Sequence, residues 1–242
     1  MTSNKGAAWF SLDKTDPIRA LDLAKSLISK YDVTQCGSAS GKFSHDYSQY
    51  LFHKSSDVPL IKEFVERVES HLGSLQQEYN RPFHIEWIYL TRTLKPQKEF
   101  CIPHKDGYWM DGQIHLTIQG EANIEVWSGG GSPYEDEKAE PELLQMPNGT
   151  IWYLNGSNYW HNAKTLEAEL PEGRIELLAP VNPHGTEEYH DCLLPGPEKR
   201  IDTNCENWKR IKMRHIQLEK EAQQDGSSSS PYNLEYIKGF EE

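Results

Sequence analysis

The stretch from residue 83 to residue 179 restricts the fold of the whole chain. It holds short segments rich in β-branched and aromatic residues, at 85–94, 113–119, 124–127, 150–154 and 174–179. Turn residues separate them, and no helical pattern interrupts them. Strands that follow one another without crossover helices favour antiparallel pairing in a sandwich or jelly roll over a parallel sheet. We therefore predict a mainly β fold.

Two amphipathic helices are predicted before this region. Asp16-Pro17 is a typical helix start, because the Asp side chain can cap free N–H groups and Pro is tolerated at the first position. A second helix is predicted from near Asp57-Val58-Pro59, with its apolar residues on one face. That face consists of Ile61, Phe64, Val65, Val68, Leu72 and Leu75.

We interpret the 242 residues as a single domain. Residues 1–82 form an N-terminal helical support, residues 83–182 the β core, and residues 183–242 an extension with one helix at about 204–224. The segment 128–142 is rich in Gly and acidic residues and is predicted to be a solvated loop, either a lid or disordered. The Asn148-Gly149 and Asn155-Gly156 pairs predict tight turns.

Composition excludes several classes of function. A mean hydropathy of -0.75 and the absence of an apolar run near the roughly 20 residues of a membrane span indicate a soluble protein. The net charge of -12 argues against nucleic acid as a partner. Four scattered cysteines without a C-x-x-C pair argue against structural zinc and a redox dithiol. The first residues lack the apolar stretch of a signal peptide, so we expect a cytoplasmic protein.

The segment Ile102-Pro103-His104-Lys105-Asp106 carries the main chemical signal. Alternate side chains of an extended strand share a face, so His104 and Asp106 would point to one spot. His161 follows a turn-rich stretch and supplies a third ligand. Two His and one carboxylate that leave open positions on a metal are the arrangement of non-haem Fe(II) oxygenases. A surface His beside an Asp is the alternative interpretation of the H-x-D motif.

Arg174 adds to this set because it opens the apolar segment Arg174-Ile175-Glu176-Leu177-Leu178. A guanidinium group can hold a carboxylate through two hydrogen bonds. The co-substrate 2-oxoglutarate needs a cation at its far carboxylate while its keto-acid end chelates iron. His115 shares a strand face with Gln113 and Thr117, so it is predicted to line a polar pocket, with a core histidine as the alternative.

With these residues the chain resembles the aspartyl/asparaginyl β-hydroxylase-like branch of the 2-oxoglutarate oxygenases, which includes bacterial proline cis-hydroxylases acting on the free amino acid. The resemblance covers about residues 85–181. Its motifs are Ile102-Pro103-His104-Lys105-Asp106, Ile114-His115-Leu116, Gly149-Thr150-Ile151-Trp152-Tyr153-Leu154, His161 and Arg174.

The resemblance implies a double-stranded β-helix of the jelly-roll, cupin-like kind, with His104, Asp106 and His161 as iron ligands. It implies Fe(II), 2-oxoglutarate and O2 as cofactors, with His115 helping Arg174 to bind 2-oxoglutarate. Gln113 is a third candidate for binding 2-oxoglutarate; it stands where the family often has Arg, which places greater reliance on Arg174 and His115. Because Asp106 completes the triad, hydroxylation is favoured over halogenation.

By resemblance the substrate is a small molecule, an amino acid or a derivative, which is hydroxylated at an unactivated C–H with release of succinate and CO2. Tyr108 and Trp109 are predicted pocket walls, and Arg92 is a candidate for a substrate carboxylate. Two alternatives stay open: a hydroxylase of protein Asp or Asn side chains, and a cupin-like metal-binding module without oxygenase activity. A homodimer also stays open. His184 and His190 flank Glu187-Glu188 and could form a second metal pair, but they stand in a Pro/Gly-rich stretch that we interpret as a solvated loop.

Overall fold

The computed structural model describes residues 6–30, 47–93, 103–106, 110–129, 131–135, 138–163, 173–183, 187–202, 205–210 and 213. Their elements in chain order are β1 (Trp9–Lys14), α1 (Pro17–Lys30), β2 (Tyr47–His53), α2 (Pro59–Tyr79), β3 (Trp87–Thr93), β4 (Gln113–Gln119), β5 (Ala122–Val126), β6 (Glu142–Met146), β7 (Thr150–Leu154), β8 (His161–Ala163), β9 (Arg174–Pro180) and the 3₁₀ helix η1 (Glu187–Cys192).

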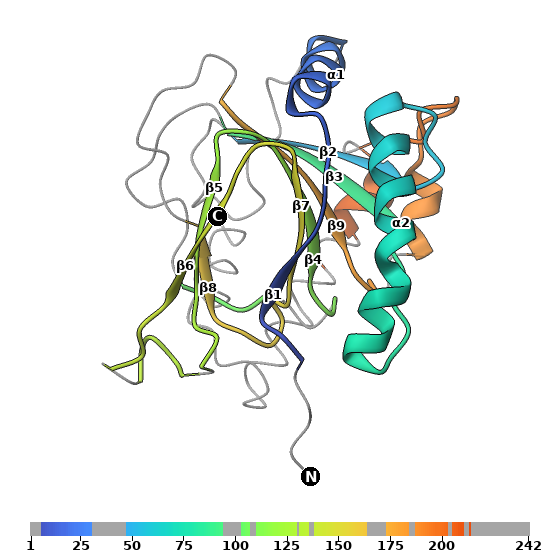
Figure 1. The fold of residues 1–242 in the computed structure, drawn as a ribbon. Coiled ribbons are helices and arrows are strands. Elements are labelled where there is room, and N and C mark those ends of the chain that lie inside the picture. The colour runs from blue at the N-terminus through green and yellow to red at the C-terminus, as the bar shows by residue number, and fades with distance from the viewer. Residues whose placement is uncertain are drawn as a thin grey trace.

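These strands form two sheets that face each other (Figure 1). The major sheet has six strands in the order β1-β7-β4-β9-β3-β2, and the minor sheet has three in the order β6-β5-β8. Every strand pair within the described ranges is antiparallel. This arrangement confirms the predicted jelly roll with flanking helices.

The two faces of the major sheet differ in chemistry. On β4 the outward residues Ile114, Leu116 and Ile118 belong to one apolar cluster with the buried faces of α1 and α2. Figure 1 shows α2 beside the major sheet on the side away from the minor sheet. The inward residues include Trp152 and Leu154 of β7, which pack against apolar side chains of β5 and β6. The space between the sheets therefore receives the alternate, more polar residues of β4 and β9.

The helices begin where the sequence indicates. The Asp16 carboxylate accepts hydrogen bonds from the backbone N–H groups of Ile18 and Arg19, at 2.9 and 3.3 Å, which satisfies free donors at the start of α1. Helix α2 begins at Pro59, as predicted, and ends at Tyr79; the next residue, Asn80, caps it with a φ of 50°, the left-handed conformation typical of a helix end.

Four strands were not predicted, namely β1, β2, β6 and β8. Strands β1 and β2 lie at the two edges of the major sheet, so residues 1–82 contribute strands as well as helices. The predicted loop 128–142 ends where β6 begins. In the predicted C-terminal helix the described residues 206–210 and 213 are helical, and most of that segment lies outside the described ranges. Over the described ranges, no helix combines the length and apolar character needed to cross a membrane.

Candidate metal and co-substrate site

His104 and His161 are held opposite each other by an antiparallel bridge. Each backbone N–H donates to the carbonyl of the other residue at 2.9 Å. Directly paired residues carry their side chains on the same face, and the two imidazole rings lie 4.4 Å apart between centroids. Because His161 also begins β8, this bridge attaches the H-x-D segment to the edge of the minor sheet.

Asp106 joins the two imidazoles, as the strand alternation predicts. Its Oδ1 lies 3.6 Å from His161 Nε2 and 3.9 Å from His104 Nε2. Ligand atoms of an octahedral ion with bonds of about 2.1 Å lie about 3 Å apart when adjacent and about 4.2 Å apart when opposite. One donor atom from each side chain lies within 4.8 Å of the other two, so a small readjustment lets all three reach one cation.

The charges of this cluster support one another. Burial raises the pKa of Asp106, but the charge and hydrogen bond of His161 and the charges of His104 and His115 outweigh it, so that the pKa is lowered. Burial lowers the pKa of His161, but Asp106 outweighs it and the pKa is raised. The Oδ2 atom of Asp106 is buried and has no hydrogen-bond partner among the described residues. A buried carboxylate oxygen of this kind calls for a cation or a donor.

Gly156 forms the wall behind this carboxylate. The Asp106 N–H donates to the Gly156 carbonyl at 3.0 Å. A Cβ atom at position 156 would lie 2.0 Å from Asp106 Oδ2 and 2.8 Å from His161 Cε1. The predicted Asn-Gly turn therefore leaves room for two of the three candidate ligands.

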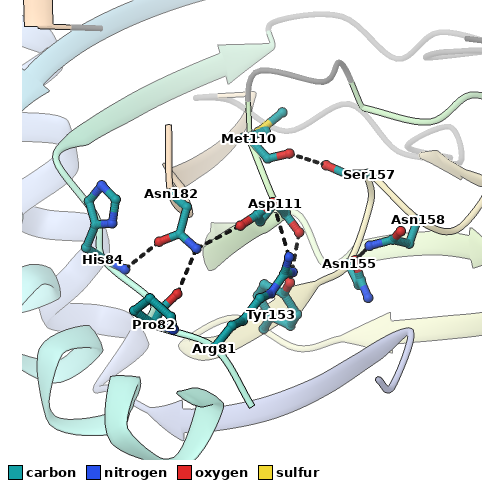
Figure 2. Close-up of polar contacts among 10 residues, drawn as sticks. All are labelled: Arg81, Pro82, His84, Met110, Asp111, Tyr153, Asn155, Ser157, Asn158 and Asn182. Atoms are coloured by element: carbon teal, nitrogen blue, oxygen red, sulfur yellow. Dashed lines mark hydrogen bonds and ion pairs between the residues drawn. The ribbon is translucent and has the colours of Figure 1, made fainter. Parts of the chain in front are cut away.

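Backbone carbonyls of the N-terminal segment anchor this turn. Asn155, which is fully buried, donates its N–H to the Ala8 carbonyl at 2.9 Å and its side-chain amide to the Ala7 carbonyl at 3.4 Å. The Asn158 side-chain amide donates to Asn155 Oδ1 at 2.8 Å (Figure 2). The turn that carries Gly156 is thus held from both sides.

A second network fixes the start of β4. Figure 2 shows the Asn182 side chain between two segments, donating to the Pro82 carbonyl at 2.9 Å and to Asp111 Oδ2 at 2.7 Å. The hydroxyl of Ser157 donates to the Met110 carbonyl at 2.6 Å. These bonds connect the end of β9, the start of β4 and the Gly156 turn, so the elements carrying His115, Arg174 and the metal cluster are held in register.

Arg174 and Glu176 form a buried ion pair on the inward face of β9. Arg174 Nη2 donates to Glu176 Oε1 at 2.7 Å, and the two side chains are 4% and 10% exposed. The strand register places Glu176 opposite Thr117 of β4 and Thr91 of β3. The predicted co-substrate cation is therefore paired with a carboxylate. Sequence reasoning missed this pair, although a Glu two residues from an Arg in an apolar strand was a visible signal.

His115 lies on the same inward face and is buried. Its ring stacks on Trp152 with centroids 4.1 Å apart and planes 14° apart. Burial, the largest influence, lowers its pKa to about 4, so the ring is neutral near pH 7. Neither ring nitrogen has a hydrogen-bond partner within the described ranges. Two buried ring nitrogens without a hydrogen-bond partner fit a residue that contacts a ligand better than they fit a core histidine.

The remaining predicted residues are placed as follows. Gln113 lies on the inward face, with its amide 3.6 Å from Met110 Sδ. Arg92 pairs with Ile175, whose side chain belongs to the apolar cluster under the helices, so Arg92 projects away from the face of His115 and Arg174. Tyr108, Trp109 and His184 lie outside the described residues.

Comparison with known proteins gives matches at the level of structure. No protein-family model and no curated protein sequence matches the chain. A Pseudomonas putida prolyl-4-hydroxylase superposes with a TM-score of 0.51 at 8% identity, over 76% of this chain and 96% of that protein. HygX from Streptomyces hygroscopicus, solved with nickel and 2-oxoglutarate bound, superposes with a TM-score of 0.51 at 12% identity, over 83% and 95%. The chain shares its fold with both proteins.

Proposed function

We propose that the chain is an Fe(II)- and 2-oxoglutarate-dependent dioxygenase that hydroxylates an unactivated C–H bond of a small molecule, with release of succinate and CO2. One observation carries this proposal: His104, Asp106 and His161 converge beside buried atoms, Asp106 Oδ2 and both ring nitrogens of His115, that have no hydrogen-bond partner among the described residues. The fold around them is shared with a prolyl-4-hydroxylase and with a protein solved with 2-oxoglutarate bound.

The residues fit an iron ion. Two neutral imidazoles and one carboxylate on one side of an ion are the ligand set of non-haem Fe(II) oxygenases. Bound iron would activate O2 together with 2-oxoglutarate, the chemistry that the protein side chains lack. The ligands are held by the His104–His161 bridge and the Gly156 turn, which act before any metal arrives.

Arg174 and His115 fit the co-substrate. Arg174 is a buried cation on the face that looks toward the minor sheet, and His115 offers two ring nitrogens on the same face. A dicarboxylate would receive a charge-assisted hydrogen bond from Arg174 and a neutral one from His115. Glu176 would have to share the guanidinium with it, since Arg174 and Glu176 are paired.

The substrate class rests on the sequence resemblance. A free amino acid or a derivative is proposed because the motifs around His104, His115 and Arg174 resemble those of proline cis-hydroxylases. The predicted pocket residues Tyr108 and Trp109 stay part of this proposal, whereas the placement of Arg92 on the outward face removes the reason to give it a substrate role.

The test is succinate formation by Fe(II)-loaded protein with 2-oxoglutarate, O2 and a panel of amino acids and of peptides that contain Asp or Asn, followed by mass spectrometry of the hydroxylated product. We expect His104→Ala and His161→Ala each to abolish turnover while retaining the fold. His84→Ala removes an exposed histidine elsewhere and is the matched control. Unchanged succinate formation in either ligand variant would refute the assignment. Metal binding without succinate from any substrate would favour the cupin-like module, and hydroxylation of peptides alone would favour the protein hydroxylase.

A further inference from the structure

Three side chains from distant parts of the sequence meet at the edge of the major sheet. They are His53 at the end of β2, Glu86 just before β3, and His190 in η1. One donor atom from each lies within 4.8 Å of the other two. This cluster repeats the composition of the His104 cluster, two imidazoles and one carboxylate, with a separate set of residues.

The geometry of the cluster is well defined. His190 Nε2 lies 2.8 Å from Glu86 Oε1. The rings of His53 and His190 lie 5.1 Å apart between centroids, and each lies close to the buried Trp87 ring, at 5.1 and 5.2 Å. The indole thus forms an apolar wall beside both imidazoles, which limits how far either ring can turn away.

Backbone hydrogen bonds hold the ligand-bearing segments together. The Lys54 N–H donates to the Glu86 carbonyl at 2.8 Å, and the His53 N–H donates to the Lys199 carbonyl at 2.8 Å. The side chain of His53 is itself oriented by Ser55, whose Oγ lies 2.7 Å from Nδ1 and whose backbone N–H donates to Nδ1 at 3.2 Å. A cation bound at Nε2 would require Nδ1 to carry the proton and to donate it to Ser55 Oγ, which is the orienting role that the second ring nitrogen has in metal sites.

We propose that His53, Glu86 and His190 bind a divalent cation of the zinc class, which cross-links η1 to strands β2 and β3. Two imidazoles and a carboxylate suit Zn²⁺ and its neighbours, whereas Mg²⁺ and Ca²⁺ prefer ligand sets made of oxygen atoms. The His190 side chain is 43% exposed and that of Glu86 is 22% exposed, so water completes the coordination on the open side.

The cross-link has a structural use. Strand β2 is an edge strand of the major sheet, and residues 199–201 lie along it through the Phe52–Arg200 bridge and the hydrogen bond from the Ile201 N–H to the Leu51 carbonyl, at 2.7 Å. The Leu193–Ile201 bridge connects these residues to the end of η1. Exposed edges favour unwanted pairing with other chains, and covering segments prevent it. A cation at His190 would fix this covering segment through the last turn of η1.

The test is the number of Zn²⁺ ions bound by chelator-stripped protein, measured by calorimetric titration. In a His104→Ala/His161→Ala background, which removes the first cluster, we expect one ion to remain and to raise the thermal midpoint. Adding His190→Ala should abolish both effects, and adding His84→Ala should abolish neither. Ser55→Ala should weaken binding about 10-fold or more through loss of the orienting contact.

The zinc count separates this proposal from the proposed enzyme function, because it is measured where the first cluster is absent. If that background binds no zinc, or if His190→Ala leaves zinc binding unchanged, the second site does not exist and the cluster is a hydrogen bond between His190 and Glu86 beside rings that pack edge to face. Should His190→Ala fail to fold, Glu86→Gln, which keeps the size of the side chain, is tested in the same background. It should likewise lower zinc binding and the zinc-dependent rise of the thermal midpoint.

Discussion

Replacing Gly156 with Ala tests whether the turn behind Asp106 sets the ligand geometry. The new Cβ would lie 2.0 Å from Asp106 Oδ2, whereas ordinary contact begins at about 3.5 Å. The carboxylate would have to move by roughly 1.5 Å, and His161 Cε1, at 2.8 Å, would have to move as well. A displacement of about 1 Å in an active site can cost roughly 100-fold in rate.

We therefore expect Gly156→Ala to lower Fe(II)-dependent succinate formation by about 100-fold or more and to weaken metal binding. The free energy of unfolding should fall by about 1–3 kcal/mol, the usual result of overpacking. Gly129→Ala is the control, since a Cβ there meets nothing within 4 Å. Metal titration and a coupled succinate assay on both variants decide the matter: wild-type metal affinity and turnover in Gly156→Ala would show that Asp106 is not held as a ligand by this turn.

Four further changes test other parts of the structure. Arg174→Ala should raise the 2-oxoglutarate concentration for half-maximal turnover by about 10- to 150-fold, from a contact worth about 1.5–3 kcal/mol; an unchanged value would point to another anchor. Glu176→Gln should tighten 2-oxoglutarate binding in calorimetry, because it removes the competing carboxylate, and should destabilise the ligand-free protein; weaker binding would contradict this competition. Folding lowers the pKa of His115 from 6.5 to about 4, so between these pH values only the unfolded state binds the proton. The free energy of unfolding should therefore fall by about 3 kcal/mol as the pH is lowered from 6.5 to 4. Urea titrations at several pH values should show a flatter pH profile for His115→Gln than for the wild type. Gly73→Ala, at an exposed position inside α2, should raise the free energy of unfolding by about 1 kcal/mol in urea titration.

Local pattern predicted much of the core. The bounds of β4 and β7 follow from their β-branched and aromatic residues, and the alternation of Ile114 and Leu116 with His115 predicted the two faces of β4. The H-x-D spacing likewise predicted that His104 and Asp106 point to one place. Such features depend on neighbours within a few residues, which a single sequence displays.

Features that depend on distant partners were not predictable. Strands β1 and β2 lie at sheet edges, where polar residues are tolerated on both faces of the strand. Their sequences therefore show no clear alternation of polar and apolar residues. The role of Gly156 as the wall behind Asp106 requires knowing that residues far apart in sequence touch. The same holds for His190, which was interpreted as part of a solvated loop and lies in η1 beside Glu86.

The anchoring of Asn155 by the carbonyls of Ala7 and Ala8 has a consequence for how this chain tolerates change. A backbone carbonyl is the same in every residue type, so a substitution at either alanine leaves these two hydrogen bonds available. Inserting or deleting one residue before β1 would instead shift the carbonyls relative to Asn155 or move β1 out of register with β7. These two hydrogen bonds should therefore depend on the length of the N-terminal segment more than on the residue type at position 7 or 8. The buried Ala8 side chain restricts substitution for a separate reason, its packing in the apolar cluster between the sheets.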